Sequence, residues 1–288
     1  MPRFNISEII GVTEGKILGA KYINEFCGIS IDSRTIRKGE LFIALRGNNF
    51  DGHDFIKEVL LKGASGAVVS KDFNPDALED FILIVVKDTL VALKDIASFH
   101  RSKFDIPLIG VTGSNGKTTT KEMIHEVLSS RYRVLKTSLN NNNQIGVSLA
   151  MLNLDSSFDV SIAELGINHY GEMEVLRKIC RPSVAVFTNI GCSHLEFFDT
   201  PRNVLKAKMG LIDCFGDKDT AVINADDNLL KEEFIEKKRG IKTVSFGIKE
   251  NADFKARVVA LDNDGTYFEI NGVRFFIPVL GLQNIYNA

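Results

Sequence analysis

The sequence predicts a two-domain α/β protein, in which a small N-terminal α/β domain precedes a domain with a mostly parallel sheet, a phosphate-binding loop and a small β-meander. Three observations predict this fold class. The chain has 288 residues, more than the roughly 100 to 200 residues of a single domain. Short apolar runs typical of strands alternate with helical stretches. A glycine-rich segment that ends in a lysine follows one of these runs and opens a helix.

The composition is that of an ordinary globular protein. Hydrophobic residues make up 44% and charged residues 25% of the chain, and the formal net charge of -2 excludes a global basic surface for nucleic acid. The four cysteines form no CxxC pair, which argues against a disulfide framework or a structural zinc site and favours a reducing cytoplasm. The N-terminus lacks a signal-peptide pattern, and the densest apolar run, residues 81–86, is far shorter than the about 20 residues needed to span a bilayer. We expect a cytoplasmic monomer with no nucleic-acid or membrane partner.

The first domain begins with a mixture of strand and helix signals. Its predicted elements are three strands and one helix, at residues 41–45, 66–69, 82–86 and 54–62. Thr89 is expected to cap a following helix, and Pro107 begins a new apolar strand. The boundary is therefore placed near Asp88, which gives domains 1–88 and 89–288.

The second domain alternates strands and helices. Its predicted parallel strands are at residues 108–111, 160–165, 184–188 and 221–224. A β-meander is predicted at residues 255–261, 266–270 and 274–278, with Asp264-Gly265 and Asn271-Gly272 as its turns. Residues 282–288 begin a helix without a terminating signal, so we expect the chain to be a piece of something longer.

The strongest chemical signal is a phosphate-binding loop. Backbone N–H groups of such a loop and the start of its helix favour phosphate. Lys117 is expected to neutralise the terminal phosphates, and the Thr118 hydroxyl to ligate Mg²⁺. The loop residues assigned to nucleotide binding are Thr112, Gly113, Ser114, Asn115, Gly116, Lys117, Thr118 and Thr119.

This loop departs from the strict G-x-x-x-x-G-K-[ST] spacing, because five residues separate Gly110 from Gly116. A loop of this kind does not identify the reaction that the protein catalyses, since GTPases, kinases, motor ATPases and ligases share it. A GTPase would have an Asn-Lys-x-Asp motif that reads the base, and the sequence contains none.

Three polar residues lie after the predicted strands, where open parallel sheets collect their ligands. They are Glu164, His194 and, within the next helix, Lys208. Taken alone, each has an ordinary alternative: a solvated or capping carboxylate, a loop histidine bonded to backbone, and a solvated helix lysine. Beside a phosphate loop these residues would have a function as metal ligands, because phosphoryl transfer to a carboxylate brings together negative charges that divalent cations offset.

Several motifs, in order, resemble the signatures of the Mur ligase family. The loop T-G-x-x-G-K-T is the variant carried by this family and by folylpolyglutamate synthetases. The other matching segments are residues 164–173 (ELGINHYGEM), 181–196 (RPSVAVFTNIGCSHLE), 204–208 (VLKAK) and 223–227 (INADD). The chain looks most like the members that join D-alanyl-D-alanine to UDP-N-acetylmuramoyl-tripeptide.

The resemblance implies roles for these residues. Glu164 and His194 would ligate a second Mg²⁺, and CO₂ would carbamylate Lys208, turning a cationic amine into an anionic oxygen ligand. The implied metal ligands are thus Thr118, Glu164, His194 and Lys208, and the implied catalytic residues are Lys117, Lys208 and His194. Asn284 and Asn287 match an adenine-contacting motif, in which Gln283 stands where the family has histidine and cannot carry its charge.

The resemblance also implies a sugar-nucleotide site. The first domain resembles the family's UDP-binding module, in which serine hydroxyls and an arginine hold a uracil edge or a diphosphate. The residues assigned to it are Ser30, Asp32, Ser33 and Arg34. Asn142 and Asn143, in an asparagine run, match a loop that touches the muramoyl nucleotide.

The implied reaction uses ATP to convert the terminal carboxylate of UDP-N-acetylmuramoyl-tripeptide into an acyl phosphate, which the amine of D-alanyl-D-alanine attacks. One alternative is the ligase that adds the third amino acid, although its Ser-Ser-His after the metal-binding glutamate is replaced here by residues 165–169 (LGINH). Folylpolyglutamate synthetase lacks the UDP module. A third alternative is a non-catalytic nucleotide-binding fragment. The family's C-terminal domain has no counterpart in these 288 residues, so we expect the chain alone to bind nucleotides but to turn over poorly.

Overall fold

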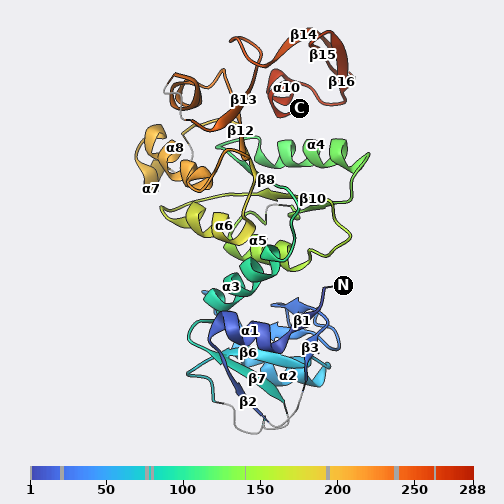
Figure 1. Ribbon diagram of the computed structural model, residues 1–288, viewed down its shortest axis with the longest axis vertical. Coiled ribbons are helices and arrows are strands. Elements are labelled where there is room, and N and C mark those ends of the chain that lie inside the picture. Colours follow the sequence, from blue (N-terminus) through green and yellow to red (C-terminus); the bar gives the residue numbers. More distant parts are fainter. Residues whose placement is uncertain are drawn as a thin grey trace. The chain divides into compact units, whose positions relative to one another are not determined.

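The computed structural model forms two compact units, which are described separately (Figure 1). The first comprises Met1–Phe104 and Ser148–Ser156, and the second Asp105–Val147 and Ser157–Ala288. The structure describes residues 2–19, 23–74, 78, 81–139, 141–192, 195–236, 240–262 and 264–288.

The first unit is built on a five-stranded sheet of order β2-β7-β6-β5-β4, in which only β2 runs antiparallel to its neighbour. The sheet strands are β2 (Lys16–Leu18), β4 (Ile29–Ser30), β5 (Leu41–Ile43), β6 (Gly66–Ser70) and β7 (Ile82–Val86). A separate antiparallel pair is formed by β1 (Phe4–Asn5) and β3 (Glu25–Phe26). The helices are α1 (Ile6–Thr13), α2 (Ile56–Leu61) and α3 (Thr89–Ser102).

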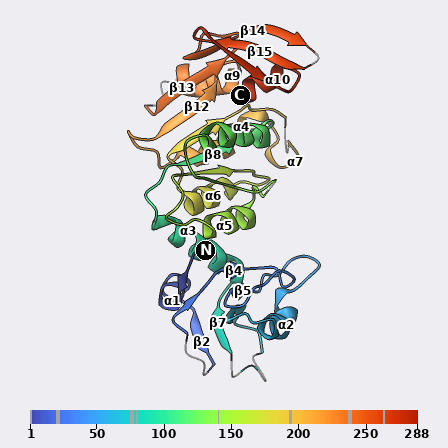
Figure 2. The same cartoon turned by 90° about the vertical axis from the view of Figure 1, so that its right-hand side faces the viewer.

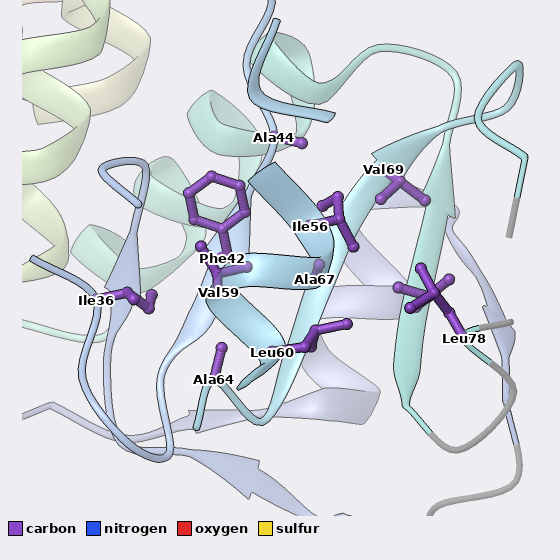
Figure 3. Packing of buried hydrophobic residues seen from close by; sticks show 11 residues of the cluster. Ile36, Phe42, Ala44, Ile56, Val59, Leu60, Ala64, Ala67, Val69 and Leu78 are labelled. Atoms are coloured by element: carbon purple, nitrogen blue, oxygen red, sulfur yellow. The ribbon is translucent and has the colours of Figure 1, made fainter. Parts of the chain in front are cut away.

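The core of this unit lies between α2 and the sheet. Figure 3 shows Ile56 and Val59 of the helix beside Phe42 and Ala67 of the strands. All four side chains are almost fully buried. Strand β6 is buried along its whole length, which agrees with its run of small and apolar residues before Ser70.

The second unit contains a nine-stranded sheet of order β16-β15-β14-β13-β12-β11-β8-β10-β9. Its parallel strands are β8 (Leu108–Thr112), β9 (Val134–Lys136), β10 (Val160–Glu164), β11 (Val184–Phe187), β12 (Thr220–Asn224) and β13 (Lys242–Gly247). The antiparallel meander is β14 (Phe254–Asp262), β15 (Gly265–Ile270) and β16 (Val273–Ile277). Since β14 pairs in parallel with β13, the meander continues the same sheet.

Helices cover both faces of the parallel strands. In both views α4 (Lys117–Ser129) lies on one side of β8 and β10, with α6 (Glu172–Cys180) on the other (Figures 1 and 2). Helix α5 (Gln144–Leu152) begins in this unit, and its residues from Ser148 onward belong to the first unit. The remaining helical segments are α7 (Leu195–Phe198), α8 (Pro201–Met209), α9 (Asn228–Lys231), a π-helical turn (Glu232–Glu236) and α10 (Leu282–Asn287). The predicted mostly parallel sheet between helices is confirmed.

The meander is also confirmed, down to one of its turns. Asn271 and Gly272 both have positive φ, 51° and 81°, and connect paired Ile270 and Val273. Positive φ at both central residues is the geometry that selects Asn-Gly in two-residue hairpins.

Several local expectations were wrong. The cap of α3 is Asp88, whose side chain accepts hydrogen bonds from the N–H groups of Leu90 and Val91, and not Thr89. The helix expected at residues 54–62 begins instead with a 3₁₀ turn, Gly52–Phe55. Short strands such as β9 and β13 were missed, because their sequences lack a distinct apolar run.

Helix α3 packs against α1 and β6 and therefore groups with the first unit, whereas it was expected to belong to the second. The domain boundary that was predicted near Asp88 stays a prediction. The cysteines, which all lie within the described residues, form no disulfide. No helix in the described part of the chain is both long and apolar enough to cross a bilayer.

Candidate functional site

The candidate site forms where three neighbouring parallel strands end. Strand β8 lies between β10 and β11, and Glu164 pairs with Val111 while Phe187 pairs with Thr112. The carboxyl ends of the three strands therefore meet at one edge of the sheet. After β8 the chain goes on to β9 and β10 on one side of β8, and after β11 it goes on to β12 on the other side. This edge is therefore a topological switch point, the usual ligand site of open α/β sheets.

The predicted phosphate loop connects β8 to α4. Gly113 and Gly116 have φ of 149° and 81°, which other residues rarely adopt. A Cβ atom at Gly113 would overlap the Thr188 hydroxyl, and one at Gly116 would overlap Asn287 Oδ1. Because α4 begins at Lys117, the first N–H groups of this helix have no partner inside it and can receive an anion.

Other loop donors are used within the protein. The Ser114 and Asn115 N–H groups donate to the backbone oxygen and to Oδ1 of Asn189, at 2.8 and 3.0 Å. The Thr112 hydroxyl is buried and donates to Leu165 O at 2.9 Å. The N–H groups at the start of α4 therefore fit the expected role of binding phosphate better than these donors do. The donors of Thr112, Ser114 and Asn115 stabilise the loop itself.

Lys117 folds back over the loop. Its Nζ donates to the backbone oxygens of Gly113 and Ser114 at 3.0 and 3.1 Å. Burial lowers the pKa of Lys117, and the nearby Glu164 carboxylate partly offsets this. A partly desolvated ammonium over the loop is suited to phosphate oxygens, which would replace the two carbonyl partners.

Glu164 is the last residue of β10 and is only 1% exposed, so the solvated alternative is excluded. Its Oε1 accepts a hydrogen bond from Asn142 Nδ2 at 2.9 Å, and its N–H donates to Thr137 Oγ1 at 2.9 Å. Its Oε2 is buried and has no hydrogen-bond partner among the described residues, although Lys121 Nζ lies 3.7 Å away. A buried carboxylate oxygen with spare capacity fits a metal ligand.

Lys208 is only 2% exposed, so it is no solvated helix lysine. Helix α8 is capped by Thr200 and begins with Pro201, and Lys208 lies on its buried face with Val204 and Leu205. Burial, together with the positive charge of Lys117, lowers the pKa of Lys208 to about 7. Much of this side chain is therefore a neutral amine near pH 7.

A cavity of about 420 Å³ brings several predicted residues together. Lys117 and Lys208 line it together with Asn142, Asn143 and Glu172. Asn143 Oδ1 also accepts hydrogen bonds from backbone N–H groups at the start of α5. The cavity thus brings two lysines of the predicted ATP site together with the asparagine run that was predicted to touch the muramoyl nucleotide.

The C-terminal helix α10 reaches the phosphate loop. Thr120 Oγ1 donates to Asn287 Oδ1 at 3.4 Å, and Asn287 Nδ2 donates to Asn284 Oδ1 at 3.3 Å. The hydroxyl of Tyr286 donates to Asp226 Oδ2 at 2.7 Å and ties the helix to the end of β12. The two asparagines predicted to contact adenine are therefore adjacent, and one of them touches the nucleotide loop.

In the first unit, the residues predicted to bind a sugar nucleotide form one turn. Arg34 donates to both carboxylate oxygens of Asp32 at 2.9 and 2.7 Å, and these hydrogen bonds lower the pKa of Asp32 to about 2. Ser30 Oγ accepts the Asp32 N–H at 3.1 Å, and the Ser33 carbonyl accepts Lys62 Nζ at 2.9 Å. Arg34 remains largely exposed, so its guanidinium is accessible to a diphosphate.

His194 lies outside the described residues. Three residues important to the geometry were missed: Lys121, Thr137 and Asn189. For Lys121 a signal existed, because it stands four residues after Lys117 and so lies one helical turn away. Thr137 and Asn189 contact the site from separate strand ends, which no local pattern reveals.

The fold and site define a nucleotide-binding α/β protein with a phosphate loop, a buried carboxylate and a buried lysine at a common sheet edge. Two family models match the chain. The description of one is "Mur ligase middle domain", over residues 111–288, and that of the other is "Mur ligase family, catalytic domain", over residues 25–101. The chain belongs to the Mur ligase family.

Similar proteins carry more specific names. The UDP-N-acetylmuramoyl-tripeptide--D-alanyl-D-alanine ligase of Bacillus subtilis is 34% identical over 99% of this chain and 61% of its own length. A crystal structure of MurF from Acinetobacter baumannii matches with a TM-score of 0.90 and 29% identity, over 100% of this chain and 63% of that one. MurF ligase from Thermotoga maritima in complex with ADP has a TM-score of 0.78 and 30% identity, over 90% and 60%. The chain thus spans somewhat less than two thirds of these relatives.

Proposed function

We propose that this chain provides the UDP-sugar-binding and ATP-binding parts of an amide ligase that joins D-alanyl-D-alanine to UDP-N-acetylmuramoyl-tripeptide in peptidoglycan precursor synthesis. The observation that carries the proposal is the cavity that Lys117 and Lys208 share with Asn142 and Asn143. The names of the similar proteins support the substrates. A cytoplasmic location and a monomeric state belong to the same proposal.

The chemistry has two steps. A carboxylate oxygen of the tripeptide attacks the γ-phosphorus of ATP, and ADP leaves. The amine of D-alanyl-D-alanine then attacks the acyl carbon, phosphate leaves, and the amine nitrogen loses a proton. Such reactions depend mainly on positioning and on charge stabilisation. Lys117, at the start of α4 and facing the cavity, would hold the γ-phosphate oxygens throughout the transfer.

Divalent cations would be held by Thr118 at the loop and by Glu164, with His194 and a carbamylated Lys208 completing the second set. When bound, Mg²⁺ offsets the repulsion between ATP and the attacking carboxylate. The buried Glu164 Oε2, which accepts no hydrogen bond from the described residues, supports this assignment. Asn142, which donates to the other oxygen of Glu164, would fix the orientation of the carboxylate.

The carbamate on Lys208 is supported by the pKa of its amine. CO₂ adds to a neutral amine, and the new C–N bond is accompanied by loss of a proton. A lysine with its pKa at about 7 supplies that neutral form at physiological pH, whereas an exposed lysine does not. The resulting anion would also pair with the neighbouring Lys117 charge.

ADP formation tests this proposal. With ATP, Mg²⁺ and bicarbonate present, we expect ADP to form slowly and only when UDP-N-acetylmuramoyl-tripeptide is added, and more of it when D-alanyl-D-alanine is also present. Replacing the tripeptide by the dipeptide precursor with a free third amino acid tests the alternative ligase. ADP formation that depends on the dipeptide and not the tripeptide would transfer the assignment to that enzyme.

A further inference from the structure

Lys121 is a buried cation that the proposed chemistry does not use. It lies on α4, one turn after Lys117, and its side chain has no exposed surface. Its Nζ donates to the backbone oxygens of Thr137 and Leu139, at 3.0 Å each. Two carboxylates also face it, with Glu122 Oε1 at 3.1 Å and Glu164 Oε2 at 3.7 Å.

These partners belong to different parts of the site. Thr137 directly follows β9, and Leu139 belongs to the asparagine loop, by which we mean residues 138–139 and 141–143. Glu164 ends β10. A buried ammonium is costly unless its donors are paired, so the arrangement of four oxygens around Nζ restrains all of these segments together.

The contacts close a ring. Lys121 bonds to Leu139, the loop continues to Asn142, the Asn142 amide donates to Glu164 Oε1, and Glu164 Oε2 faces Lys121 again. The backbone of Asn142 adds a bond, because its carbonyl accepts the Gly166 N–H at 3.0 Å. The ring therefore connects the nucleotide-binding helix to the side of the cavity formed by asparagines.

The backbone of Leu139, in the asparagine loop, has an unfavourable conformation. Its φ is 43°, in the left-handed region that disfavours a branched side chain. Its side chain is 81% exposed, so no burial of the leucine compensates. Such a conformation persists only where surrounding contacts impose it, and the bond from Lys121 to the Leu139 carbonyl is one such contact.

We infer that Lys121 is a positioning residue that fixes the asparagine loop and Glu164 relative to the nucleotide-binding helix. This inference rests on the proposed function for its ligands. Lys121 sets the geometry of the site that binds the muramoyl nucleotide, whereas Lys117 contacts ATP itself. Loss of Lys121 should therefore weaken binding of UDP-N-acetylmuramoyl-tripeptide more than binding of an ATP analogue.

The test compares Lys121→Met with Lys136→Met. Methionine fills the space of the lysine stem without its charge. Lys136 provides a matched control, because it also pairs with Glu122 and, among the described residues, its ammonium contacts His125 rather than Glu164. We expect Lys121→Met to weaken tripeptide binding about tenfold or more while ATP-analogue affinity changes far less, and Lys136→Met to leave both affinities within about threefold of the parent.

Hydrogen exchange measured without ligand tests the loop separately from the proposed function. Lys121→Met should speed amide exchange in peptides that cover residues 138–146, and Lys136→Met should not. If Lys121→Met does not fold, Lys121→Gln, which retains a donor for one carbonyl, takes its place in both measurements. Unchanged loop exchange, or an equal loss of both affinities, would overturn the inference. A parent chain that binds no tripeptide but shows the loop effect would instead contradict the proposed function alone.

Discussion

Replacing Lys208 by methionine is expected to raise the free energy of unfolding at pH 7 by on the order of 4 kcal/mol. Burial lowers the pKa of this lysine from 10.5 to about 7, and each pKa unit corresponds to about 1.4 kcal/mol. The unfolded chain therefore binds more protons between pH 7 and 10.5, so the stability of the parent should rise with pH across that window. Below pH 7 the penalty is fully present. Methionine removes both the penalty and this pH dependence.

Urea unfolding from pH 6 to 10 in CO₂-free buffer measures this effect. Lys206→Met is the matched control, since Lys206 lies on the same helix and is exposed. It should change the stability little at any pH. With ¹³C-bicarbonate, a carbamate resonance should appear in the parent and in Lys206→Met and be absent from Lys208→Met. A destabilised Lys208→Met, with the parent's pH dependence intact, would mean that Lys208 is not a desolvated amine.

The second large effect is expected for Gly113→Ala. Its φ of 149° is nearly inaccessible to alanine, and the new methyl would overlap the Thr188 hydroxyl. Strain and overpacking together should lower the free energy of unfolding by on the order of 3 kcal/mol. Because Gly113 precedes the start of α4, the displaced loop should also bind an ATP analogue at least about a hundredfold more weakly.

Gly191→Ala controls for a methyl group beside the same loop. A Cβ there would meet Ser114 at an ordinary 3.5 Å, so thermal unfolding and calorimetric titration should both resemble the parent. If Gly113→Ala kept the parent's affinity for the ATP analogue, the loop would not be the phosphate site.

Much of the fold is local enough to be predicted from sequence. Strand β7 was predicted with its observed limits, because it is an uninterrupted run of isoleucine, leucine and valine that ends at Lys87. The phosphate loop was predicted because the strand, the glycines and Lys117 follow one another directly. Asn271-Gly272 was predicted because few residue pairs adopt two positive φ values.

The rest depends on contacts between distant segments. Thr120 and Asn287 touch although 167 positions separate them, and no local pattern encodes that contact. The functional role of Lys208 was inferred from family resemblance alone, yet its spacing from Val204 and Leu205 already places it on the apolar face of α8. Lys121 was missed because a lysine is rarely fully buried. Its position is stabilised by the backbone oxygens of Thr137 and Leu139 and by two carboxylates, which come from separate parts of the chain.

The central claim is that one chain holds both an ATP site and a muramoyl-nucleotide site. Isothermal titration tests it most directly, with a non-hydrolysable ATP analogue and, separately, with UDP-N-acetylmuramoyl-tripeptide, both in Mg²⁺ and bicarbonate. We expect saturable binding of each ligand at a single site. Binding of the ATP analogue without binding of the tripeptide would contradict the account and leave a phosphate-loop protein whose second substrate has to be sought elsewhere.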